Sequence, residues 1–275
     1  MWPGDAFPGH TFYVIAFAPR TGSNLLADDL TANGLGAPSE YFQPGADGNG
    51  FRWSADLGVV DGDLEAYLAA LVALRGVGEM FGTKLAWDHR NALLEAAARL
   101  SGTPQSLDDL FPGVRYIRLV RRDKIGQALS LWRAMATQRW TSLDGPAPEP
   151  AYDYFAVLVA LFGVLVDDHL WKRELDATTA PVFDLAYEDF LADRAGTIAR
   201  LATFLHNDGA PVLESPGIEL SGRFERQSDD RSDAARERFL EDLDHRGSAA
   251  HWASRAREVE AWNEFMLGGG WRVGE

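Results

Sequence analysis

Apolar and polar positions along the chain follow two patterns, and together these predict strands that are followed by helices. Residues 12–18, FYVIAFA, form an unbroken apolar run rich in residues that favour strands. Such a run is typical of a strand buried on both faces of a parallel sheet. Shorter runs at 79–87 and 114–120 predict two more strands, and 180–190 predicts a strand that leads into a helix.

Between these strands, apolar residues recur at the spacing of a helix. The segments predicted to be helical are 22–34, 63–75, 123–140, 151–176, the stretch from 190 toward 205, and 233–268. Two segments rich in glycine, proline or polar residues, 36–62 and 207–232, are predicted to be loops. Strands alternating with helices predict an α/β fold of three layers, in which helices flank a central parallel sheet.

The length and composition limit the class of protein. The 275 residues suit a single domain, with a core at about 11–205 and a C-terminal loop and helical segment at 207–275. The net charge of −15 argues against nucleic acid or an anionic membrane as a partner. Without cysteine, the chain offers no disulfide and no thiolate site. The apolar run 155–166 is shorter than the roughly 20 residues of a membrane span, so we expect a cytoplasmic protein.

The first candidate site is the turn after the first strand, PRTGSN at 19–24. The amino terminus of a helix carries unpaired N–H groups and the positive end of the helix dipole, which suits an anion such as phosphate. Gly22 lets the backbone approach an oxyanion, and Arg20 adds a fixed positive charge. The loop lacks the lysine of a P-loop NTPase, so it predicts an anion site without naming the anion. A helix cap beside a surface arginine is the plain alternative.

A second basic cluster lies where the strand 114–120 passes into the next helix. Arg118, Arg121, Arg122 and Lys124 gather there in an otherwise acidic chain, and Ser130 follows about two turns into the helix. The guanidinium of Arg122 and the hydroxyl of Ser130 are suited to share one phosphate. Runs of charge are more often solvated surface, and that alternative stays open on this evidence.

The two candidate sites together resemble the sulfotransferases that use 3′-phosphoadenylyl sulfate (PAPS), and within them the bacterial Stf0 group, typified by trehalose 2-sulfation. The similarity rests on PRTGSNLL followed about a hundred residues later by RRDKIGQALSLWR. Further matching segments are GAPSEYFQ, FGTKLAW, LWRAMATQRW, YEDF and RQSD, in that order along the chain. The resemblance covers roughly residues 12–240. It implies the sulfotransferase variant of the P-loop-NTPase-like fold, and a homodimer.

The resemblance also implies how the chain would hold PAPS and its product 3′,5′-ADP. The 5′-phosphosulfate would be held by Arg20, Thr21, Gly22, Ser23 and Asn24. Arg122 and Ser130 would hold the 3′-phosphate, and Tyr187 would contact the adenine. Arg226 and Gln227, on a late polar loop, would close over the nucleotide.

Four residues are candidates for the chemistry of transfer, which is an in-line displacement that moves a sulfuryl group to a hydroxyl. Arg20 would stabilise the negative charge that builds on the leaving phosphate. A base must take the proton of that hydroxyl during attack. Glu40 matches the general base of the Stf0 group, and His89 is the alternative base. Lys84 faces either the transferring group or a neighbouring carboxylate. No histidines stand at metal-ligand spacing on a helix, so no metal is expected.

The acceptor is expected to be a small molecule with hydroxyl groups, either a sugar or a glycolipid precursor. Trp53, Trp87 and Trp132 fall near the inferred site, and flat aromatic faces suit sugars. Ala37 replaces an acidic residue that Stf0-like proteins often carry in the acceptor region. Two other functions are kept as alternatives. One is a P-loop kinase-like enzyme that uses ATP, and the other is a nucleotide- or sugar-binding protein without catalysis.

Overall fold

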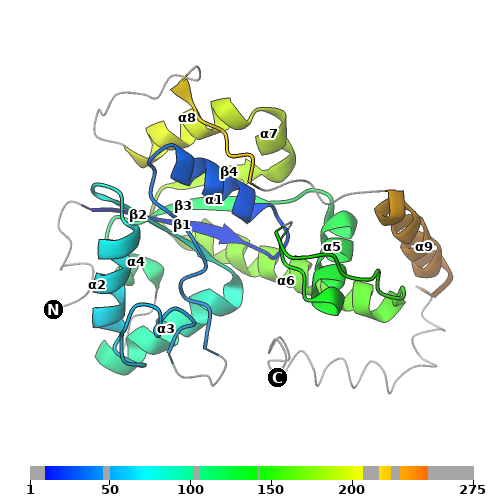
Figure 1. Cartoon of the computed structure of the whole chain (residues 1–275), viewed down its shortest axis with the longest axis horizontal. Helices are drawn as coiled ribbons and strands as arrows, with labels where there is room; N and C mark the ends of the chain where they lie inside the picture. The colour runs from blue at the N-terminus through cyan, green and yellow to red at the C-terminus, as the bar shows by residue number, and fades with distance from the viewer. Residues whose placement is uncertain are drawn as a thin grey trace.

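A four-stranded parallel sheet forms the centre of the computed structural model (Figure 1). The structure describes residues 10–45, 50–101, 106–141, 143–206, 217–223 and 230–246. The strands are β1 (Thr11–Phe17), β2 (Met80–Leu85), β3 (Arg115–Val120) and β4 (Val182–Ala186), in the order β2-β1-β3-β4. In the register, Ile15 of β1 stands opposite Lys84 of β2 and Ile117 of β3. All four predicted strands are therefore present, and the α/β prediction is confirmed.

Nine helices lie among the described residues. Their bounds are α1 (Ser23–Ala32), α2 (Leu64–Arg75), α3 (Trp87–Ser101), α4 (Leu107–Leu110), α5 (Lys124–Thr137), α6 (Tyr154–Ala177), α7 (Tyr187–Ala192), α8 (Arg194–Leu205) and α9 (Asp230–Arg246). The sequence analysis did not predict α3 or α4. Much of the predicted loop 207–232 and of the helical segment 233–268 lies outside the described residues.

The strand β1 is apolar at every position because each of its faces is covered by helices. Tyr13, Ile15 and Phe17 point to one face and pack with residues of α1, α7 and α8. Phe12 and Val14 point to the other face and pack with residues of α2, α3, α4 and α6. Side chains alternate between the two faces of a strand, so a strand at the centre of three layers must be apolar throughout.

Several helices begin at an aspartate that caps their first turn. Asp63, Asp123, Asp153 and Asp193 accept hydrogen bonds from the backbone N–H groups at the start of α2, α5, α6 and α8, respectively. A cap of this kind satisfies N–H groups that have no partner within the helix, and it is worth about 1 kcal/mol. The predicted helices 63–75 and 123–140 begin at two of these aspartates.

Among the described helices, α6 is long and apolar enough to cross a membrane by length and composition alone. It has 24 residues, twice the 12-residue apolar run on which the sequence analysis judged it too short. Its Val157, Ala160 and Val164 are buried in a cluster with residues of α5 and α9. Farther along, Trp171 and Leu175 pack into the core beneath the sheet. The apolar positions of α6 thus supply two parts of the core.

The four strands run in the same direction, so their carboxyl ends meet at one edge of the sheet. The segment after β1 is the loop 18–22, and α3 begins at Trp87, two residues after β2 ends. Arg121 directly follows β3, and Tyr187 directly follows β4. Ligands of open α/β sheets bind at this edge, and the candidate residues gather there.

Candidate functional site

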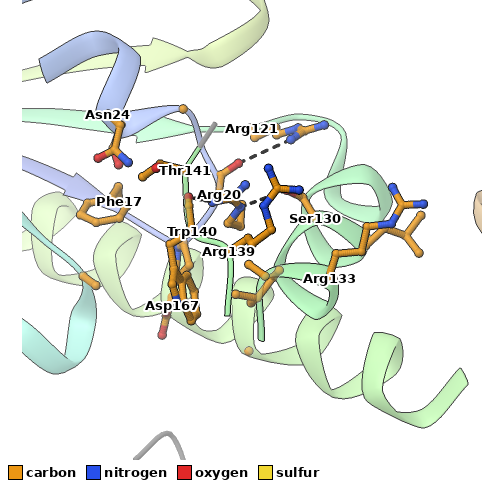
Figure 2. A pocket seen from close by; sticks show the side chains of 18 of the residues that line it. Phe17, Arg20, Asn24, Arg121, Ser130, Arg133, Arg139, Trp140, Thr141 and Asp167 are labelled. Atoms are coloured by element: carbon orange, nitrogen blue, oxygen red, sulfur yellow. Dashed lines mark hydrogen bonds between the residues drawn. The ribbon is translucent and has the colours of Figure 1, made fainter. Parts of the chain in front are cut away.

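A cavity of about 1380 Å³ opens at the carboxyl edge of the sheet. Its wall contains the loop after β1, the start of α3, the inner face of α5, the segment that follows α5, and part of α6 (Figure 2). Of the residues proposed from the sequence, the cavity is lined by Arg20, Gly22, Ser23, Asn24, Glu40, Trp87, His89, Ser130 and Tyr187. Segments far apart in the sequence therefore meet around one space.

The loop after β1 has a backbone shape that opens the start of α1 toward the cavity. Arg20 and Gly22 both adopt positive φ angles, of 69° and 82°. Gly22 is the residue that caps α1, and no side chain caps its first turn. A Cβ atom at Gly22 would lie 2.4 Å from the ring of Tyr187, so the ring rests directly on the loop. Only glycine fits this position, because any other side chain would meet the ring and strain the backbone.

The guanidinium of Arg20 joins this loop to α5 and to the segment after it. Its Nε donates a hydrogen bond to Ser130 Oγ at 3.0 Å, and its Nη1 donates to the carbonyl oxygen of Trp140 (Figure 2). Burial lowers the pKa of Arg20 from its ordinary value, and the nearby positive charge of Arg121 lowers it further. Two neighbouring guanidinium groups in a partly desolvated pocket favour an anion between them.

Arg121 is turned toward the cavity. Its Nη1 donates to the carbonyl oxygen of Arg20 at 3.5 Å, and its guanidinium carbon lies 5.4 Å from the centre of the Tyr187 ring. Its Nη2 lies 3.5 Å from Oδ2 of Asp123, whereas its buried Nε has no hydrogen-bond partner among the described residues. An unsatisfied buried donor on a cation is costly unless a ligand completes it. The sequence analysis placed Arg121 in the basic cluster but gave it no role.

Arg122 has a different environment, and the structure does not bring it into the cavity wall. Its side chain is 59% exposed and makes a two-pronged ion pair with Asp189, which holds the pKa of Arg122 above its ordinary value. The backbone N–H groups of Arg122 and Asp123 donate to the carboxylate of Glu188, which ties the end of β3 to α7. The proposed pairing of Arg122 with Ser130 on one phosphate would require Asp189 to release this guanidinium.

Glu40 and Lys84 form an ion pair beside the anion loop. The buried ammonium of Lys84 lies 3.0 Å from Glu40 Oε1 and also donates to Oδ1 of Asn24, in the first turn of α1. Burial acts to raise the pKa of Glu40, but the positive charge of Lys84, with smaller contributions from His89 and Arg52, makes the net pKa lower than usual. Glu40 is therefore a carboxylate at neutral pH, and the pairing alternative for Lys84 is the one observed.

His89 lies in the first turn of α3, close enough to Glu40 to contribute to its pKa. The residue is 5% exposed, and its Nδ1 has no hydrogen-bond partner among the described residues. Its Nε2 lies 3.8 Å from Oδ1 of Asp88. Both bases proposed from the sequence thus line the same cavity, and their positions in its wall do not decide between them.

The three tryptophans proposed for the acceptor differ in position. Trp87 lines the cavity, and its ring contacts Arg90 and Trp171. Trp53 lies outside the cavity wall, where it packs between Tyr41 and Arg75. Trp132 is 4% exposed in the core between α5 and α6, because it falls on the apolar face of α5. Of these three, Trp87 alone lines the cavity, and Trp140 lines it as well.

The remaining predicted residues have separate positions. Thr21 is fully buried, and its hydroxyl has no partner among the described residues. Arg226 and Gln227 lie outside the described residues. The described part of the chain contains no group of three or more His, Cys, Asp or Glu side chains that could hold a metal ion.

The cavity is also lined by carboxyl groups that the sequence analysis did not consider, among them Asp88, Asp123, Asp144 and Asp167. Asp167 of α6 lines the cavity, at the side of Figure 2 away from Arg121. Burial raises its pKa to about 7, and the neighbouring carboxylates of Asp88 and Asp168 raise it as well. The signal in the sequence was the pair of aspartates that interrupts the apolar run of this helix, at VLVDDHL.

Comparisons with known proteins found a matching family model, two relatives of similar length and a similar solved structure. The model of the family described as Stf0 sulphotransferase matches residues 12–242. A trehalose 2-sulfotransferase of Mycolicibacterium smegmatis is 25% identical over 268 residues, covering 86% of this chain and 97% of that protein. Its counterpart in Mycobacterium tuberculosis is 25% identical over 260 residues, with coverages of 82% and 93%. The crystal structure of a sulfotransferase from Alicyclobacillus acidocaldarius matches with a TM-score of 0.46 and 14% identity, over 92% of this chain and 98% of that one.

Proposed function

This chain belongs to the Stf0 sulphotransferase family and is a sulfotransferase, and we propose that it moves a sulfuryl group from PAPS to a hydroxyl of a carbohydrate or a similar small metabolite. One observation carries the proposal. The same cavity is lined by an anion loop with Arg20 and Ser130, and by the carboxylate of Glu40. A site for an anionic donor and a base for a hydroxyl acceptor are the two parts that such a transfer requires.

The chemistry of the cavity wall fits PAPS as the donor. The first turn of α1 has no side-chain cap, and Nε of Arg121 is buried without a partner among the described residues. Both supply donors for phosphate or sulfate oxygens. We assign the 5′-phosphosulfate to the loop residues with Arg20, and a face of the adenine to Tyr187. Ser130 and a neighbouring arginine would hold the 3′-phosphate.

Either of two adjacent arginines is a candidate for the 3′-phosphate. The family resemblance favours Arg122, whereas Arg121 is the one that lines the cavity. Substituting each in turn with methionine, and measuring the affinity for 3′,5′-ADP, separates them. Loss of affinity in the Arg122→Met variant alone would mean that Asp189 exchanges its partner for the phosphate. Loss in the Arg121→Met variant alone would assign the contact to Arg121.

The residues around Glu40 have distinct tasks in the reaction. When bound, PAPS supplies the sulfuryl group, and the electron pair of the broken S–O bond leaves with 3′,5′-ADP. Glu40 accepts the proton of the acceptor hydroxyl while the new O–S bond forms. Lys84 holds Glu40 in its ionised form and fixes its position beside Asn24. Arg20 and the loop amides stabilise the negative charge that develops on the leaving phosphate.

Nucleotide binding tests this proposal directly. We expect 3′,5′-ADP to raise the melting temperature of the purified protein, and labelled PAPS to pass its sulfate to trehalose or another sugar. The probe trehalose is chosen because the two relatives described above carry it in their names. No thermal shift with 3′,5′-ADP, together with a magnesium-dependent shift with ATP, would replace the proposal with the kinase alternative. Nucleotide binding without any transfer would favour the non-catalytic alternative.

A further inference from the structure

The cavity has charges of opposite sign at its two ends. Arg20 and Arg121 lie at the end formed by the anion loop and α5, where Asp123 and Asp144 offset part of their positive charge. At the other end, Asp88 of α3 and Asp167 of α6 both line the cavity, and the carboxylate of Asp88 is close enough to raise the pKa of Asp167. The proposed donor accounts for the positive end, but nothing in its chemistry accounts for the negative one.

Asp167 is distinguished from its neighbour on the same helix by what it touches. Asp168 forms an ion pair with Lys124, which is part of the packing between α5 and α6. Asp167 points into the cavity and has no hydrogen bond or ion pair among the described residues. Successive residues of a helix point about 100° apart, so one aspartate serves the packing while the other is presented to the cavity. A partly buried carboxyl that contributes nothing to packing is destabilising unless it serves a ligand.

The space between Asp167 and the reacting end is lined by groups that suit a hydroxylated molecule. His89 is close enough to Glu40 to lower the pKa of that carboxyl, and its Nε2 lies 3.8 Å from Oδ1 of Asp88. Its side chain is 7% exposed, and Nδ1, which has no hydrogen-bond partner among the described residues, supplies a further polar atom. The ring of Trp87 adds an apolar wall. Glu40, His89, Asp88 and Asp167 thus all line the cavity and supply it with polar atoms.

We propose that Asp167 and Asp88 form an acceptor-binding subsite, which takes a neutral, polyhydroxylated molecule by accepting hydrogen bonds from hydroxyls remote from the one that is sulfated. This inference rests on the function proposed above. The two carboxyl groups oppose an anionic acceptor. Near Glu40, the positive charges of Lys84 and Arg52 repel a cationic acceptor. A molecule that reaches from Glu40 to Asp167 is therefore best accommodated when it carries no charge.

Transfer from labelled PAPS to three probes tests this subsite on the full-length chain. The probes are trehalose, glucosamine as a cation and glucose 6-phosphate as an anion. We expect trehalose to be sulfated with the highest kcat/KM. In the Asp167→Leu variant, the KM for trehalose should rise about tenfold or more, since a hydrogen bond to a charged group is lost. The Asp167→Asn variant should show a smaller rise, because an amide oxygen still accepts hydrogen bonds.

A matched control is available on the same helix. Asp176 of α6 is 55% exposed and pairs with Lys172 outside the cavity, so the Asp176→Asn variant should keep the wild-type KM. Three results would overturn the inference. They are a wild-type KM in the Asp167→Leu variant, a kcat/KM for glucose 6-phosphate that equals that for trehalose, and no sulfation of any probe. Binding of 3′,5′-ADP is measured on every variant. Its presence with either of the first two results leaves the proposed function standing. Its presence with no transfer to any probe favours the non-catalytic alternative, and its absence in the wild type refutes the proposed function itself.

Discussion

Replacing Asp167 with asparagine should stabilise the protein, and the gain should increase with pH. The pKa of this carboxyl is about 7 in the folded protein, whereas its ordinary value is 3.8. Between these two values the unfolded chain is ionised and the folded one keeps its proton, so the free energy of unfolding falls as pH rises. Above pH 7 the penalty is constant. Asparagine has the shape of the protonated side chain and carries no such penalty.

The size of the effect follows from the difference between the two pKa values. That difference corresponds to a penalty of as much as about 4 kcal/mol at pH 8. Asp167 lines an open cavity, and water there screens its charge, so we expect less than half of this value. Between pH 5 and pH 8 the stabilisation by Asp167→Asn should grow by about 1–2 kcal/mol. For a chain of this size, that corresponds to a few degrees in melting temperature.

Urea unfolding followed by tryptophan fluorescence at several pH values measures this dependence. The Asp176→Asn variant is the control, because a hydrogen bond from Lys172 lowers the pKa of Asp176 and its loss should not stabilise the protein at any pH. A gain in Asp167→Asn that is the same at pH 5 and pH 8 would refute the reasoning. So would a loss of stability at pH 8, which would mean that the ionised carboxylate has a stabilising partner.

Three further predictions concern the loop, the base and the packing around them. The Glu40→Gln variant should lose about 100-fold or more in kcat, while its affinity for 3′,5′-ADP, measured by calorimetry, stays near the wild-type value; unchanged turnover would transfer the role of base to another residue. The Gly22→Ala variant should weaken 3′,5′-ADP binding about tenfold or more, since its Cβ meets the Tyr187 ring, and retained affinity would contradict the close contact. The Arg194→Met variant leaves the fully buried carboxylate of Asp29 without its ion-pair partner, so the free energy of unfolding in urea should fall by about 3–5 kcal/mol. A fall below about 1 kcal/mol would show that this pair adds little.

Much of the site could be predicted from the sequence. The loop at 19–24 was predicted to be an anion site because it follows a buried strand and opens a helix, and both elements are present. Glu40 and His89 were candidates for the base, and both line the cavity beside this loop. The anion loop was predicted from a local pattern of strand, glycine turn and helix. Glu40 and His89 were candidates only through the family resemblance, because an isolated carboxylate or histidine in a sequence does not point to catalysis.

Other features depend on directions that a sequence does not encode. Arg121 and Arg122 are adjacent and chemically identical, yet one lines the cavity and the other pairs with Asp189 on α7. Trp132 lies close to the site in sequence but points into the core, because its spacing places it on the apolar face of α5. The rotation of each side chain about its backbone follows from the packing of neighbouring elements.

The sequence by itself determined the strands, most of the helices and the position of the anion loop. The features responsible are the spacing of apolar residues, the aspartate caps and the glycine turn, and each of them acts over a few residues. Only the tertiary structure decided the ionisation of the site. The pKa of Glu40 depends on Lys84 from β2, and that of Asp167 depends on Asp88 from α3. A pKa reflects burial and nearby charge, and the charges concerned stand tens of residues away in the chain. Their proximity exists only once the sheet has brought α3, α6 and the anion loop to one edge.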